Sequence, residues 1–484
     1  MIRLPYLRRL LAAAAAALVA GCASTPMATR PAPAARPASL GGVAVAFLDT
    51  LERRTFDWFW ETTNPRNGMT PDRWPSRPFA SIAAVGFALT AYPVGVERGW
   101  ITREQAAERT LTTLRTFWTL PQGEAARGTI GRWGFFYHFL DMETGLRHEL
   151  TELSTIDTAL LIGGVLFAGQ YFDGSGGAEP EIRALADSLY RRVEWSRFQV
   201  ENPLVTMAWR PERGMGPARY QGYDEAMLLY VLALGSPTHA VGPEAWTAFT
   251  STYTWGEFHG QEHLNFAPLF GHQYSHVWID FRGIRDAYMR EKGIDYFENS
   301  RRATLAQRDY AIANPSGWAG YGEHVWGLTA SDGPGSATIT IDGRERRFQG
   351  YWARGAALND VRDDGTIAPT AAGGSIPFAP VVTVRALMTM RDRYGDDLYK
   401  RYGFVDAFNP TLAGATMETR RGAIVPGKGW FDDDYIGIDQ GPIVTMIENY
   451  RTELIWERMK GSPHVVRGLC RAGFTGGWLE GRCE

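Results

Sequence analysis

The chain has 484 residues, of which 45% are hydrophobic and 13% aromatic, and its formal net charge is −3. A chain of this length and composition can bury a large core. Because acidic and basic residues nearly balance, the charge gives no reason to expect nucleic acid or an anionic membrane surface as a partner.

The first 22 residues have the pattern of a bacterial export signal. Arg3, Arg8 and Arg9 precede a short apolar run, LLAAAAAALVA. The run is too short for a stable membrane span and ends in small residues, as signal peptides do. Residues 19–22 (VAGC) resemble a lipobox, so we expect Cys22 to be lipidated, with an ordinary signal peptide as the alternative. Both interpretations predict an exported protein; the first predicts a lipid-anchored protein that faces the periplasm and meets the membrane only through its anchor.

A tether and one helical domain are predicted to follow. Residues 23–42 are rich in Ala, Pro, Ser and Thr, which indicates a disordered tether. Residues 43–461 show helical periodicity almost throughout, with only short strand-like pieces such as 337–341, and no repeat or linker divides them. The predicted helices cover residues 43–63, 81–91, 103–119, 154–172, 179–197, 223–234, 243–253, 275–290, 300–314, 377–394 and 441–459.

Three of these helices are apolar on every side, so each is predicted to be enclosed by protein. Their first turns carry Asp157, Asp224 with Glu225, and Asp439. Taken singly, each acid is explained as a helix cap, because acids suit the positive end of the helix dipole. Three buried helices that all begin with acids favour a second interpretation. If the helices run parallel, their acidic ends converge at one pole and form a site.

The alternation of buried and amphipathic helices predicts an all-α fold with two concentric layers, an (α/α)6 barrel. Its parallel inner helices would begin beneath long Gly- and aromatic-rich loops, which in compact domains are more often functional than idle. A helical solenoid is the alternative, but it needs a regular repeat. The loops comprise residues 128–141, 258–271, 317–334, 347–374 and 422–438.

The C-terminal residues 462–484 are predicted to form a tail. Cys470 and Cys483 lie close together in it, and an oxidising compartment would allow them to form a disulfide. Neither cysteine has a partner at zinc-ligand spacing. The run Asp432-Asp433-Asp434 lacks the interleaved spacing of a calcium loop, so it is interpreted as a solvated acidic turn. We therefore expect no metal site and no cofactor, and we expect a monomer.

Five motifs stand out in the chain: WGFFYHFLD (133–141), STIDTALL (154–161), GYDEAMLLYVLALGSPTH (222–239), YSHVWIDFRG (274–283) and IDQGPIVTMIENYR (438–451). They resemble motifs of the glucoamylase-like domain proteins. Within that group the chain is similar, over residues 43–459, to the bacterial endo-β-1,2-glucanases of glycoside hydrolase family 144. The resemblance implies an (α/α)6 barrel that hydrolyses β-1,2-glucan with inversion at the anomeric carbon, by endo rather than exo cleavage.

The resemblance also implies roles for individual acids. Inverting hydrolysis needs a carboxylic acid that protonates the leaving oxygen and a carboxylate that activates water. Glu225 matches the family's proposed acid, and Asp439 matches the base of related fungal enzymes. We expect a high pKa for Glu225 and a low one for Asp439. The acids expected to bind sugar hydroxyls or tune this pair are Asp157, Glu152 and Asp141.

Further candidates for substrate contact follow from residue type and position. Aromatic rings can stack on sugars or simply fill the barrel, and a lone histidine is more often structural than functional. Charged residues in the long loops are expected to contact substrate as a group. These candidates are Trp133, Tyr137, His138, His276, Arg282, Glu323 and Trp326.

Several alternatives stay open at this point. The same fold could support exo action, transglycosylation or action on cyclic glucans. A polysaccharide lyase would need a Tyr or His base and cationic groups, whereas the predicted pole is rich in carboxylates. A non-catalytic glycan-binding lipoprotein would not need two carboxylates at all.

Overall fold

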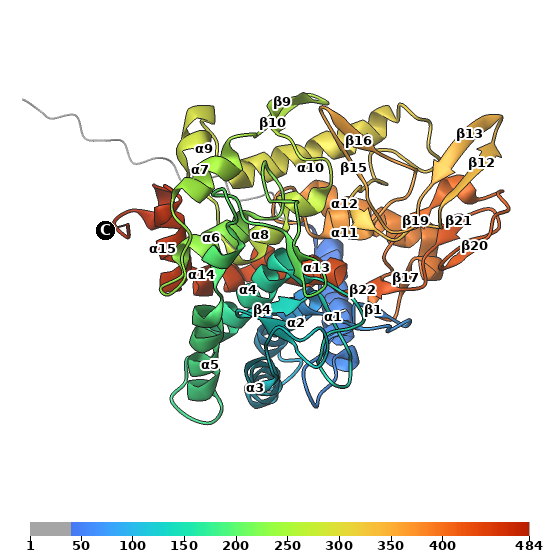
Figure 1. The fold of residues 1–484 in the computed structure, drawn as a ribbon. Coiled ribbons are helices and arrows are strands. Elements are labelled where there is room, and N and C mark those ends of the chain that lie inside the picture. The colour runs from blue at the N-terminus through green and yellow to red at the C-terminus, as the bar shows by residue number, and fades with distance from the viewer. Residues whose placement is uncertain (1–39, 484) are drawn as a thin grey trace, which may run out of the picture. The chain divides into compact units, whose positions relative to one another are not determined.

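Helices that are buried on nearly every side form the centre of the packed unit (Figure 1). In α6, for example, every residue from Met227 to Gly235 is buried. A helix without a polar face can be accommodated only where protein surrounds it. The buried helices are α2 (Ile82–Glu97), α4 (Thr155–Tyr171), α6 (Met227–Gly235), α8 (Tyr274–Trp278), α11 (Pro369–Gly373) and α13 (Gly437–Thr452).

The computed structural model describes residues 40–483. The predicted signal peptide, the lipidation of Cys22 and all but the end of the predicted tether lie outside the described residues. Within residues 40–483, no helix combines the length and the apolar composition needed to span a bilayer.

The buried helices contact one another in a closed series. α2 packs against α4 and α13, α4 against α6, and α6 against α8. α11 packs against α13, and Gln273 joins α8 to α11 because its side-chain amide donates to the carbonyl oxygen of Ala371 at 2.8 Å. α2 and α4 approach each other so closely that a Cβ added at Gly86 or at Gly164 would overlap the backbone of the other helix.

A second set of helices covers the first. α1 packs on α2 and α13, α3 on α2, α5 on α4, and α12 on α11. The predicted helical core is therefore confirmed, and the helix at residues 103–119 has the predicted bounds. The covering helices are α1 (Gly42–Thr62), α3 (Arg103–Thr119), α5 (Glu179–Arg192), α7 (Glu244–Thr250), α10 (Tyr296–Ala313) and α12 (Pro380–Tyr394).

Two predicted helices are each divided in two. The segment 275–290 forms α8 and a separate α9 (Ala287–Lys292), which Asp286 caps by accepting a hydrogen bond from the Met289 N–H. The segment 441–459 forms α13 and α14 (Leu454–Lys460), with Glu453 between them at a φ of 61°. A residue in this left-handed region ends a helix, and periodicity does not reveal it.

The predicted all-α class is wrong for the loops, which form short strands. The predicted strand-like piece 337–341 is β12 (Ala337–Ile341), and it pairs with β13 (Arg344–Phe348). One sheet has five strands, in the order β3 (Gly131–Arg132), β4 (Phe135–Tyr137), β6 (Leu153–Ser154), β7 (Ala208–Arg210) and β8 (Gly214–Met215). The strands are too short for an alternating pattern to stand out.

The other strands form small antiparallel pairs, apart from one sheet of three strands. They are β1 (Arg73–Trp74) with β22 (Tyr435–Ile436), β2 (Ala80–Ser81) with β5 (Phe139–Leu140), β9 (Trp255–Phe258) with β10 (Gln261–Leu264), β11 (Ala330–Ser331) with β14 (Trp352–Ala353), β15 (Gly355–Ala357) with β16 (Asp360–Arg362), β17 (Tyr399–Lys400) with β18 (Gly403–Phe404), and β21 (Gly429–Phe431) between β19 (Phe408–Asn409) and β20 (Ala423–Val425).

Much of the predicted C-terminal tail is a packed helix. α15 (Pro463–Arg471) lies against α6, and Gly468 allows the two backbones to touch at Val231. Cys470 and Cys483 are joined by a disulfide. This segment therefore belongs to the same packed unit as the buried helices.

A buried ion pair holds the long loop at residues 349–366. Arg354 and Asp364 are 0% and 1% exposed, and two parallel N–H···O bonds of 2.7 and 2.8 Å join them. Arg354 also donates to the carbonyl oxygens of Ser331 and Gly350, and Asp364 accepts from the N–H of Gln349. One ion pair thus fixes several turns of the loop.

The substitution Arg354→Leu is expected to lower the free energy of unfolding by about 3–5 kcal/mol, because it leaves the Asp364 carboxylate buried without its partner. Arg362→Leu is the control, since Arg362 pairs with Asp360 at the surface and should contribute less than about 1 kcal/mol. Chemical denaturation followed by circular dichroism measures both. Equal losses in the two variants would contradict the special role of the buried pair.

Candidate active site

A cavity of about 390 Å³ lies where the buried helices begin. Its lining includes Ser81, which caps α2, Asp157 in the first turn of α4, and Glu225 just before α6. Tyr274 at the start of α8 and Ile438 in the first turn of α13 line it as well. Segments far apart in the sequence therefore meet at one place through their helix N-termini.

Aromatic rings form much of the apolar wall of the cavity. Phe79 and Phe139 lie with their ring centroids 4.2 Å apart, and Phe270 and Tyr274 with theirs 5.3 Å apart. Tyr351 also lines the cavity and is 54% exposed. Flat apolar rings beside a few charged groups suit a sugar, which has apolar faces and a border of hydroxyl groups.

His138 connects two acids on one side of the cavity. Its Nδ1 lies 2.9 Å from Glu152 and its Nε2 3.5 Å from Asp157, while Glu152 also accepts a bond from Arg210 at 2.7 Å. Burial lowers the pKa of His138, but the charges of Asp157 and Glu152 outweigh it and raise that pKa to about 9. The hydrogen bond from His138 in turn lowers the pKa of Glu152 to about 2. The pair is therefore ionised at neutral pH.

Glu225 occupies the turn before α6 rather than the helix itself. We predicted a helix from residue 223, but α6 begins at Met227. Ser275 holds the turn, because its hydroxyl donates to the Glu225 carbonyl oxygen at 3.0 Å and accepts from the Leu228 N–H at 2.9 Å. Burial raises the pKa of Glu225 to about 7, and the charge of Asp157 adds to the rise. A carboxyl group that keeps its proton near neutrality suits general acid catalysis.

Asp439 lies in a second group of acids beside the cavity. It is 2% exposed and follows Ile438, which lines the cavity. Burial raises the pKa of Asp439 to about 8, and the charges of Asp332 and Asp72 add to the rise. The predicted low pKa is therefore wrong, because burial among acids outweighs the favourable helix N-terminus.

Tyr274 lies near both candidate catalytic acids, Glu225 and Asp439. Burial raises the pKa of its hydroxyl group, and the charges of Asp439 and Glu225 both raise it further. The Tyr274 side chain lines the cavity and is within electrostatic reach of both carboxyl groups. Both carboxyl groups therefore lie near Tyr274 on the cavity wall.

Asp72 and Arg73 also line the cavity, although neither was predicted from the sequence. Arg73 pairs with Asp72 at 3.0 Å and with Asp332, which lies just after β11. Strand pairing places Arg73 opposite Ile436, directly before α13. Nothing in the local sequence DRW predicts this position, because it depends on pairing between residues more than 360 positions apart.

The acidic run at residues 432–434 is not the predicted solvated turn. Asp432 and Asp434 are 1% and 0% exposed, whereas Asp433 is exposed. Asp434 accepts a bond from Arg421 at 2.7 Å, and its backbone carbonyl oxygen accepts from the N–H of Asp406. The run follows β21, whose pairing directs alternate side chains into the protein.

Three predicted substrate contacts are core residues, and the prediction is wrong for them. His276 is 0% exposed and hydrogen-bonds to Ser300 at 3.0 Å, and burial lowers its pKa to about 3. Trp326 and Tyr137 are also fully buried, the latter beneath the guanidinium group of Arg147. A side chain without exposed surface in the cavity cannot meet a substrate there.

Four further candidates lie outside the cavity lining in the described part of the chain. Asp141 caps a turn by accepting from the N–H groups of Glu143 and Thr144, and these bonds lower its pKa despite partial burial. Glu323 is exposed beside His324. The other two candidates outside the lining are Trp133 and Arg282, whose side chains contact other residues.

Trp133 and Arg282 both belong to cation–aromatic contacts. Trp133 lies 3.7 Å from the guanidinium group of Arg132 and lines a separate shallow cavity. Arg282 pairs with Asp280 and lies 4.4 Å over the ring of Trp456. Of the candidates, the cavity lining thus includes Glu225, Asp157 and His138, with Asp439 and Glu152 directly behind it.

Comparison with known proteins identifies relatives of the whole helical unit. An "exo beta-1,2-glucooligosaccharide sophorohydrolase (non-reducing end)" from Parabacteroides distasonis is 29% identical over an alignment of 456 residues, and the match covers 87% of this chain and 57% of that protein. The chain therefore spans little more than half the length of this curated relative.

Solved structures resemble the fold over most of the chain. A "putative glucoamylase" from Bacteroides uniformis is 32% identical with a TM-score of 0.77, and the match covers 92% of this chain and 100% of the other. An endo-β-1,2-glucanase from Chitinophaga pinensis, solved with sophorotriose and glucose, is 28% identical with a TM-score of 0.74. That match covers 91% of this chain and 100% of the other.

The family model described as "Putative glucoamylase" matches residues 217–463, just over half of the chain. The matched region includes Glu225, Asp439 and the buried helices α6 to α13. These findings confirm the resemblance inferred from the sequence motifs. The chain therefore belongs to the glucoamylase-like family.

Proposed function

We propose that the protein is a glycoside hydrolase that cleaves β-1,2-glucan with inversion at the anomeric carbon. The observation that carries the proposal is the cavity itself. It combines aromatic walls with Glu225, a carboxyl group whose pKa is raised to about 7, and lies beside a second buried carboxyl group, Asp439. The names of the relatives, a β-1,2-glucooligosaccharide sophorohydrolase and an endo-β-1,2-glucanase, support this linkage.

In the proposed mechanism Glu225 is the general acid and Asp439 the general base. Glu225 gives its proton to the glycosidic oxygen as the bond to the anomeric carbon breaks. Asp439 takes a proton from a water molecule that attacks this carbon from the opposite face, so the β-linked sugar leaves as the α-anomer. The charge of Arg73 lowers the pKa of Asp439, but burial keeps it at about 8, so the base becomes ionised as pH rises toward that value. Either transfer can also run through a substrate hydroxyl or an intervening water.

The residues around this pair have supporting roles in the proposal. Asp157, held by Ser154 at 2.5 Å, and Arg73 offer charged groups to sugar hydroxyls. His138 acts as a positioning residue, because it connects Asp157 with Glu152. We further propose that the closed series of buried helices and their covering helices form an (α/α)6 barrel within residues 43–461.

We propose endo cleavage, with exo cleavage as the second candidate because the curated relative is named as an exo enzyme. The product profile from linear β-1,2-glucan tests this. A ladder of oligosaccharides that first appear as α-anomers supports an inverting endo enzyme. Disaccharide alone from the earliest time points supports exo action, and no cleavage of any β-glucan would overturn the proposed activity.

The proposed setting is the bacterial cell envelope, with a monomeric enzyme anchored through a lipid on Cys22. Fractionation of cells that express the full chain tests the anchor. The Cys22→Ala variant is expected to leave the membrane fraction, and unchanged membrane association would contradict the proposal.

The substitutions Glu225→Gln and Asp439→Asn are each expected to lower kcat by about 10²–10⁴-fold, because each removes one proton-transfer group. Asp224→Asn is the matched control, since an asparagine at 224 can still accept the bond from the Ala226 N–H. Release of reducing ends from sophorotriose measures kcat, and calorimetry checks that sophorotriose still binds. A Glu225→Gln variant as active as the control would overturn its role.

The value of kcat/KM is expected to reach its maximum between pH about 7 and about 8, because Glu225 acts only while it carries its proton and Asp439 acts only without one. The charge of Asp157 raises the pKa of Glu225. Because the lower of the two pKa values belongs to Glu225, Asp157→Asn should shift the acidic limb to lower pH, whereas Asp141→Asn should leave it in place. If the limb stays where it is in Asp157→Asn, another group controls it.

A further inference from the structure

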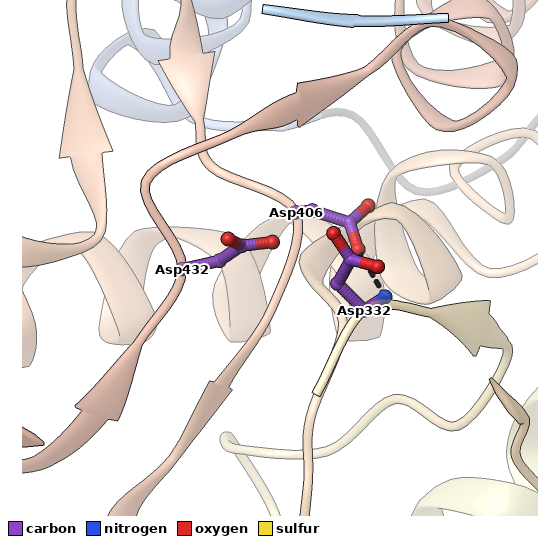
Figure 2. Close-up of side chains that lie close together, drawn as sticks. All are labelled: Asp332, Asp406 and Asp432. Carbon is purple, nitrogen blue, oxygen red and sulfur yellow. Dashed lines mark hydrogen bonds between the residues drawn. The ribbon is translucent and has the colours of Figure 1, made fainter. Parts of the chain in front are cut away.

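Three buried aspartates from separate segments meet beside the candidate active site. Asp332, Asp406 and Asp432 each offer a carboxylate oxygen, and these oxygens all lie within 4.8 Å of one another. Asp332 follows β11, Asp406 precedes β19 and Asp432 follows β21. Figure 2 shows the three carboxyl groups gathered around one point. Their exposed fractions are 3%, 2% and 1%.

Two oxygens of this triad have no partner. Asp406 uses Oδ2 to accept from the Asp332 N–H at 2.7 Å, and Asp432 uses Oδ1 to accept from the N–H groups of Asp433 and Asp434. Asp406 Oδ1 and Asp432 Oδ2 are buried and lack any hydrogen-bond partner among residues 40–483. Buried polar atoms without partners destabilise the folded state and are rare, so these two oxygens indicate a ligand-binding position.

The positive charges near the triad are also unevenly distributed among its acids. Two arginines pair with acids here: Arg73 with Asp72 and Asp332, and Arg421 with Asp434 at 2.7 Å and Asp332 at 3.7 Å. Asp406 and Asp432 have no ion pair with an arginine or lysine among the described residues. The buried acids of this region are Asp72, Asp332, Asp406, Asp432, Asp434 and Asp439.

We propose that Asp332, Asp406 and Asp432 bind one hard divalent cation, Ca²⁺ in preference to others. Carboxylate oxygens are the ligands of such ions, whereas zinc sites use nitrogen or sulfur. Because Ca²⁺ binds oxygens at about 2.3–2.6 Å, two ligands of one ion lie no more than roughly 4.6–5.2 Å apart. The spacing of the triad fits this limit. Water and backbone carbonyl oxygens complete the coordination.

The ion would join three segments behind the cavity wall. Asp332 holds Arg73, which lines the cavity, and the ion would fix Asp332 from the other side. It would thereby position Arg73 without touching the substrate. We expected no metal site from the sequence. The sequence could not reveal this one, because Asp332 and Asp406 are 74 residues apart and the three ligands show no motif spacing.

Calorimetric titration of the chelator-treated protein with Ca²⁺ alone tests the proposal. We expect one Ca²⁺ per chain, and binding weaker by about 10-fold or more in Asp432→Asn, because one charged ligand is lost. The matched control is Asp433→Asn, a neighbouring exposed acid outside the triad, which should bind as the parent protein does. Thermal unfolding with and without Ca²⁺ gives a second readout, since an ion that binds only the folded state raises Tm.

Every outcome of the titration decides the question. Absence of Ca²⁺ binding to the parent protein would overturn the proposal and indicate protonated carboxyl groups instead. Undiminished binding in Asp432→Asn would place the ion elsewhere and also overturn it. If Asp432→Asn fails to fold, the stoichiometry of the parent protein and the variant Asp406→Asn decide. No sugar is present, so the result is independent of the proposed hydrolase activity.

Discussion

Carboxyl groups that are buried at the N-termini of wholly apolar helices are the constraint on which the rest of this structure depends. Helices such as α4 and α6 have no polar face, so they can lie only at the centre. Acids at or just before their N-termini open on a shared space, which is the cavity that Asp157 and Glu225 line. The covering helices and the loop strands then follow, because they enclose this centre and supply partners for its acids.

Buried charge is compensated in different ways on the two sides of the cavity. On one side His138 is ionised and lies between Glu152 and Asp157, so opposite charges compensate within the protein. On the other side Asp406 and Asp439 have no cationic partner within ion-pair distance in the described chain, and burial raises the pKa values of both. Protons or a bound cation must supply the missing positive charge there. Charges are therefore paired within the protein on one side of the cavity, whereas on the other side they depend on protons or a bound cation.

Helix positions were largely predictable, whereas their ends and the loop structure were not. The helix at residues 103–119 is amphipathic and begins with a capping box at Thr102, so local signals define it fully. The break at Glu453 depends on a left-handed residue that carries no glycine signal. Among the site residues, Glu225 and Asp157 were recognisable because they begin apolar helices. The predictions for His276 and Trp326 were wrong, since aromatic neighbours in the sequence do not distinguish a protein core from a sugar-binding site.

The sequence by itself determined the helical core, the family resemblance and the acids at the helix starts, because hydrophobic periodicity and motif identity are local properties. Only the tertiary structure decided which charges meet. Arg73 reaches the cavity through pairing with the strand before α13, and the triad of Asp332, Asp406 and Asp432 assembles from three separate loops. The tertiary structure likewise decided the pKa of Asp439, which depends on burial and on neighbours such as Asp332 and Asp72. Such contacts join residues whose separation along the chain carries no pattern, so no local signal can reveal them.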